Sequence, residues 1–184
     1  NIKPEQIKPE LESLLKENQA QIKEILSQPK PFTWDNLMTP LESLGDRLHQ
    51  MWSPIAHLHA VKNTPDLREA YNKCLPILSE YYTSLGQNET LYEAIKSIAD
   101  SAEYHKLDFA QKKIIEHELR DFKLAGDSLT KDQKKRYAAI CKELSELTTQ
   151  FETNVLDATQ AFQLHITDEQ RLDGLPKHAL ASTA

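Results

Sequence analysis

The chain has 184 residues, of which 27% are charged and 39% hydrophobic, and its formal net charge is −6. This length is sufficient for one domain with a substantial core. The negative charge argues against a nucleic-acid-binding protein, which needs a basic surface. No apolar run approaches the roughly 20 residues needed to cross a bilayer, and the polar start of the chain does not resemble a signal peptide. We therefore expect a cytoplasmic protein that binds neither nucleic acid nor membrane.

Apolar residues recur at steps of three and four, which predicts amphipathic helices, and no segment alternates as a strand would. We predict an all-α fold, a bundle of about six helices that includes long antiparallel pairs. The first helix ends before Pro29. Thr39 and Pro40 have the form of an N-cap and a first-turn proline for the second helix. Internal prolines at Pro54 and Pro76 predict kinks in the second and third helices.

Local signals also mark the shorter elements. Residues 32–36 predict a turn, and Asn88 is placed to cap a short fourth helix. Asp108 and Gln111 form a possible capping box for a fifth helix. Gly126 suits the residue that follows this helix, where a left-handed backbone favours glycine.

A sixth helix is predicted over about residues 130–165, with Thr130 and Gln133 as its capping box. It would be roughly 50 Å long, and such a helix needs packing partners along its length. We expect it to pack antiparallel to the fifth helix. The apolar residues of its face are Tyr137, Ile140, Leu144, Leu147, Phe151, Val155, Ala158, Phe162 and Ile166.

His117 and Glu118 look like the start of the zinc motif H-E-x-x-H, in which two histidines four residues apart bind one metal. The position of the second histidine is occupied by Asp121, so the motif is broken. We interpret His117 as a surface residue. A small metal-binding bundle remains a weaker alternative.

The other candidates for chemistry also favour packing. His57 and His59 diverge on a helix, whereas Asp46 and His49 are three residues apart and could meet; we interpret both pairs as surface or core residues rather than metal ligands. The two cysteines lie on apolar helix faces and are interpreted as buried free thiols. Aromatic residues at helical spacing predict core packing, with a peptide-binding wall as the alternative. These cysteine and tyrosine positions are Cys74, Cys141, Tyr71, Tyr81, Tyr82 and Tyr92.

Six stretches, in order along the chain, resemble the N-terminal part of the zinc oligopeptidases of the thimet oligopeptidase family. Each is weak alone, and together they cover most of the chain. They are Phe32-Thr-Trp-Asp-Asn36, Asn63-Thr-Pro-Asp-Leu-Arg-Glu-Ala-Tyr71, Leu75-Pro-Ile-Leu-Ser-Glu-Tyr81, Leu119-Arg-Asp-Phe-Lys-Leu-Ala-Gly126, Phe151-Glu-Thr-Asn-Val-Leu-Asp-Ala158 and Asp173-Gly-Leu-Pro176.

The resemblance implies a large, nearly all-helical peptidase of two lobes, with a channel that admits short peptides. Its zinc would be held by the two histidines of H-E-x-x-H and a glutamate on a later helix, all beyond Ala184. The resemblance therefore places no catalytic, cofactor-binding or metal residue in this chain. Zinc would belong to the full-length parent, and the partners would be short peptides and the missing catalytic domain.

We interpret residues 1–184 as a single N-terminal helical domain, a fragment that helps wall the substrate channel. The alternative is a free-standing helical interaction domain with an apolar groove for a partner helix. The two differ in one observable property. A piece of a larger enzyme should expose the apolar face that meets the remainder.

Overall fold

The computed structural model describes residues 2–62, 64–126 and 129–183. Within these ranges the fold consists of α-helices and short helical turns and has no strand, which confirms the all-α prediction. The chain forms two compact units, Asn1–Thr148 and Thr149–Ala184. The single-domain organisation of residues 1–184 stays a prediction.

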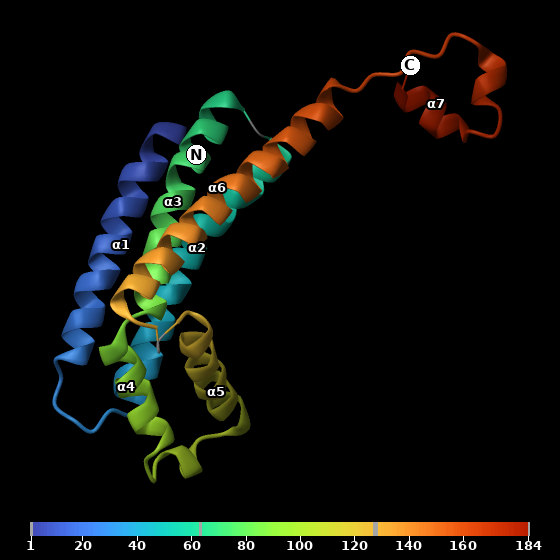
Figure 1. Cartoon of the computed structure of the whole chain (residues 1–184). Coiled ribbons are helices and arrows are strands. Elements are labelled where there is room, and N and C mark those ends of the chain that lie inside the picture. The colour runs from blue at the N-terminus through green and yellow to red at the C-terminus, as the bar shows by residue number, and fades with distance from the viewer. Residues whose placement is uncertain (1, 63, 127–128, 184) are drawn as a thin grey trace. The chain divides into compact units, whose positions relative to one another are not determined.

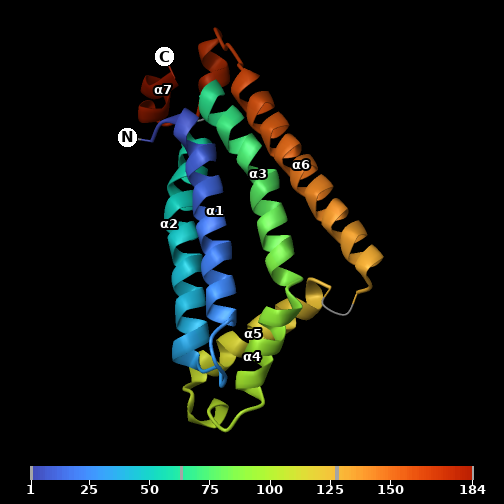
Figure 2. The same ribbon diagram turned by 90° about the vertical axis from the view of Figure 1, so that its left-hand side faces the viewer.

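Three long helices form the body of the first unit: α1 (Pro4–Leu26), α2 (Thr39–Val61) and α3 (Pro65–Gly86). Figures 1 and 2 show them side by side, with α2 running antiparallel to both neighbours. Two shorter helices, α4 (Glu89–Ala99) and α5 (Phe109–Leu124), pack at the end where α1 finishes and α2 begins. The long antiparallel pairs of the predicted bundle are therefore α1 with α2 and α2 with α3.

Local capping positions the two shorter helices as the sequence predicts. Asn88 accepts a hydrogen bond from the Leu91 amide at the start of α4. Asp108 and Gln111 form a reciprocal capping box on α5, each side chain accepting from the other residue's backbone amide. Gly126 follows the end of α5 with a φ of 90°, a conformation that favours glycine.

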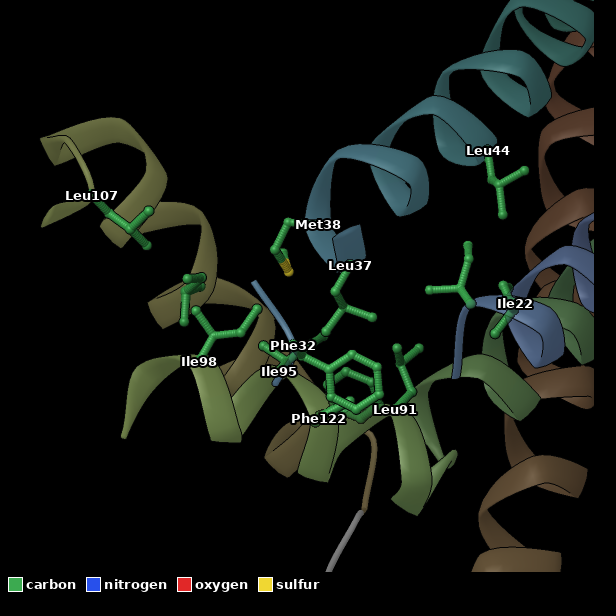
Figure 3. Packing of buried hydrophobic residues seen from close by; sticks show 13 residues of the cluster. Ile22, Phe32, Leu37, Met38, Leu44, Leu91, Ile95, Ile98, Leu107 and Phe122 are labelled. Atoms are coloured by element: carbon green, nitrogen blue, oxygen red, sulfur yellow. The ribbon is translucent and has the colours of Figure 1, made fainter. Parts of the chain in front are cut away.

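The core consists of two clusters. One joins the end of α1 and the start of α2 to α4 and α5, and Figure 3 shows its packing. The other joins the first half of α1 to the second half of α2 and to α3. The largest fully buried apolar side chains are Leu11, Leu37, Met38, Leu48, Ile95, Ile98 and Ile115.

Asn18 lies between the two clusters on α1 and is fully buried. Its Nδ2 donates a hydrogen bond of 3.2 Å to the Leu44 carbonyl of α2. Burial raises the pKa of the Tyr81 phenol on α3, and a hydrogen bond with Asn18 opposes part of that rise. This one amide therefore joins α1 to α2 and lies beside Tyr81 of α3 at the junction of the clusters.

Two predictions about helix starts need correction. The expected turn at residues 32–36 is a π-helical turn, Trp34–Met38, capped by Thr33, whose hydroxyl accepts from the Asn36 amide. This turn runs directly into α2, so Thr39 is the first residue of the helix and caps nothing. The N-cap prediction failed because the preceding residues are already helical.

The predicted antiparallel packing of the fifth and sixth helices is wrong. α6 (Lys131–Ala161) has its Thr130–Gln133 capping box, but it ends before residue 165 and contains no buried side chain. Its half-buried side chains in the first unit include Lys134, Tyr137, Ala138 and Cys141. Most of the apolar stripe that the sequence predicted as an interface with the fifth helix, from Ile140 to Phe162, is exposed instead, whereas Tyr137 is half-buried.

The second unit contains the end of α6, a 3-10 turn (Glu169–Leu172) and α7 (Lys177–Thr183). Between the last two, Gly174 has a φ of 89°, as expected of the predicted turn. None of the described helices in either unit combines the length and apolar character of a membrane span.

Candidate functional site

The broken zinc motif lies on α5 and does not assemble a metal site. His117 is exposed, and Glu118 is half-buried. Asp121, at the position of the missing histidine, accepts a hydrogen bond of 2.8 Å from Arg120, which lowers the pKa of its carboxyl. In the described ranges, no three His, Cys, Asp or Glu side chains lie close enough together to hold one metal ion.

The histidines of α2 have surroundings that suit packing. His59 stacks on Tyr71 at 4.0 Å between ring centroids, and Trp52 stacks on the same ring at 5.0 Å. His57 is exposed. The Asp46 carboxylate accepts a hydrogen bond from Gln50, one turn along the helix.

The cysteine and tyrosine candidates differ in their exposure to solvent. Cys74 is buried, which raises the pKa of its thiol to about 11, whereas Cys141 is only half-buried; both are free thiols. Tyr81 is buried and Tyr92 packs on Phe122, as core residues should. Tyr82 is an exception, because 56% of it is exposed.

The most prominent surface feature is the apolar stripe of α6. In the first unit it consists of Ile140, Leu144 and Leu147, which are 45%, 62% and 55% exposed. We call these three residues the α6 face. The same helix exposes Phe151 and Val155 where it enters the second unit.

The α6 face carries no acid, base or nucleophile, so it is suited to bind apolar surface rather than to perform a reaction. At the start of α6, Lys134 Nζ lies 2.6 Å from Glu89 Oε1 of α4. This ion pair lowers the pKa of Glu89 and joins the polar side of α6 to the bundle. The sequence showed the stripe, but it could not show which side of the helix meets the bundle.

Comparison with known proteins gives a consistent result. Residues 11–134 match the family model of the neurolysin/thimet oligopeptidase N-terminal domain. Oligopeptidase A of Haemophilus influenzae is 48% identical over 179 residues, which cover 97% of this chain and 26% of that protein. Oligopeptidase A of Escherichia coli is 44% identical over 181 residues, covering 98% of the chain and 27% of that protein. A probable cytosolic oligopeptidase A of Arabidopsis thaliana is 35% identical over 174 residues.

Proposed function

Because the chain belongs to the neurolysin/thimet oligopeptidase family, we propose that it is the N-terminal helical region of a zinc oligopeptidase that hydrolyses short peptides. The family match and the identities of 44–48% to two bacterial oligopeptidases A support this proposal most strongly. The chain spans only about a quarter of the length of these relatives, with shares of 26% and 27%. The proposal assigns peptide hydrolysis to the longer protein.

The role proposed for this region is structural. It forms part of the wall of the substrate channel and limits the size of the peptides that enter. The exposed α6 face supports this role, because a region that packs against a larger remainder should present such a surface. A chain without exposed apolar surface would favour the alternative, a free-standing interaction domain, so the exposed α6 face weakens that alternative.

The catalytic zinc is proposed to lie outside this chain. Zinc takes His, Cys, Asp or Glu ligands, usually three from the protein at a catalytic site. The described side chains offer no group of three such ligands, and Asp121 of the broken motif is paired with Arg120. We therefore assign no hydrolytic step to these residues. A cytoplasmic location is part of the proposal and is supported by the relative named as cytosolic.

A fluorogenic peptide of about ten residues tests the proposal. We expect the protein encoded by the complete reading frame to cleave it, to lose activity with a zinc chelator and to recover when zinc is restored. The 184-residue chain should show no cleavage under the same conditions. Chelator-sensitive cleavage by the chain alone, abolished by His117→Ala, would overturn the assignment of catalysis to the remainder.

A further inference from the structure

A cavity of about 410 Å³ lies inside the first unit, where the two core clusters meet. All five helices from α1 to α5 contribute to its wall. Figure 3 labels Ile22, Leu44, Leu91, Ile95 and Phe122, five of the apolar lining residues. Tyr82, which also lines the cavity, is exposed, so the cavity has access to solvent beside α3. Pockets that bind small molecules have volumes from about 300 to 1,000 Å³ and are mostly apolar.

Gly45 marks an exposed, open part of the cavity wall. It lines the cavity from the second turn of α2, and a Cβ atom added there would meet no heavy atom within 4 Å. A glycine inside a helix is less favourable than an alanine there. No turn, positive φ or close backbone approach accounts for a glycine here, in contrast with Gly86, where a Cβ would lie 2.8 Å from Ala125.

The charged side chains in the described part of the cavity wall are all acidic. Glu42 from α2 and Glu118 and Asp121 from α5 line the cavity together with apolar residues, and no Lys, Arg or His is among the lining residues that the structure describes. Asp121 is paired with Arg120, whereas neither Glu42 nor Glu118 forms an ion pair with a described residue. Burial raises the pKa of the Glu118 carboxyl, and the Glu42 and Asp121 carboxylates raise it further. A cation beside Glu118 would relieve both effects.

We propose that this cavity binds a small organic cation, with an apolar body held by the Leu, Ile and Phe side chains and an ammonium or guanidinium group against Glu118 and Glu42. The apolar wall disfavours a bare metal ion, and the three carboxylates disfavour an anion. This binding is independent of the peptidase function proposed above, because the cavity belongs to the first unit by itself and needs no catalytic group.

Glycine amide signals in an NMR spectrum of the ¹⁵N-glycine-labelled chain report on the cavity directly. The chain has four glycines, two in the cavity wall and two outside it. Three probes share a phenyl ring and differ in charge: 2-phenylethylamine, 2-phenylethanol and 3-phenylpropionate. We expect the amine to shift Gly45 and Gly86 with saturation and to leave Gly174 unchanged. The alcohol and the carboxylate should bind at least about tenfold more weakly, because they lack the charge-assisted contact.

Two pairs of variants separate cavity binding from surface attraction. Glu118→Gln should weaken binding of the amine about tenfold without changing that of the alcohol, whereas Glu116→Gln on the exposed side of α5 should change neither. Gly45→Leu should fill the cavity and abolish binding, whereas Gly45→Ala should retain it. Both Gly45 variants should remain folded by circular dichroism, because the site is open and the helix favours either residue. Equal binding of the amine and the alcohol, or unchanged binding in a folded Gly45→Leu variant, would overturn the proposal.

Discussion

Asn18 lies at the junction of the two core clusters, so its loss should be felt in both. Replacing it by alanine removes the hydrogen bond to the Leu44 carbonyl and leaves a space beside Tyr81. We expect Asn18→Ala to lower the free energy of unfolding by about 1–3 kcal/mol. Gln19→Ala, at the next and exposed position of α1, should change it by less than about 0.5 kcal/mol. Urea denaturation measures the free energy of unfolding of both variants. Equal values would show that the buried Asn18 amide does not stabilise the junction of the two clusters.

Glu118 should make the folded chain less stable as the pH rises. Its carboxyl pKa is raised above the ordinary value of 4.5, first by burial and then by Glu42 and Asp121. The folded state therefore favours the protonated form, so the stability contributed by this group is present below pH 4.5 and is lost as pH rises through the raised pKa. Glu118→Gln removes this loss and should raise the Tm at pH 7 by about 1–3 °C, with little change at pH 4.

Glu116 on the same helix provides the control of opposite sign. A hydrogen bond from Lys113 lowers the pKa of its carboxyl, so its contribution is present above pH 4.5 and is lost in acid. Glu116→Gln should therefore not raise the Tm at pH 7. Thermal melts at both pH values test the pair, and a Tm at pH 7 that rises equally in both variants would rule out the specific role of Glu118.

At the scale of the helices, α6 is the element with an apolar face that the described residues of the first unit leave exposed. Leu144 is 62% exposed at the centre of the α6 face. Leu144→Glu should change the stability of the chain by less than about 0.5 kcal/mol, because no packing is lost. Ile115→Ala, at a fully buried position of α5, should cost about 2–5 kcal/mol. Denaturation curves compare the two, and a loss above about 1 kcal/mol for Leu144→Glu would mean that the face is packed within the chain.

The helices also show where sequence reasoning succeeds. Asp108 with Gln111 and Thr130 with Gln133 mark helix starts correctly because a capping box needs residues only three apart. The prediction of Thr39 as an N-cap failed because the residues before it form a π-helical turn.

The uncovered face of α6 was not predicted, because the stripe shows that a partner is needed but not whether α5 supplies it. The cavity was also missed, since its wall comes from five helices. The mid-helix glycine at Gly45 was the one local signal.

At the scale of the whole molecule, the comparisons indicate how this chain relates to longer proteins. The family match covers residues 11–134, while similarity to the bacterial oligopeptidases A extends over nearly the whole chain. These relatives are about four times longer than the matched part. Our central proposal is therefore that this chain is the N-terminal region of a larger peptidase and that the remainder of that protein covers the α6 face.

Hydrogen–deuterium exchange tests this claim most directly, with α6 residues 131–148 compared between the 184-residue chain and the protein encoded by the complete reading frame. Backbone amides exchange quickly in a helix that makes few packing contacts. Burial of that helix against a partner slows their exchange. We predict that this segment exchanges at least about tenfold more slowly in the complete protein, whereas the buried segment around Leu11 and Leu15 changes little. Equal exchange of the α6 segment in both proteins would contradict the claim, because the face would then remain uncovered when the rest of the protein is present.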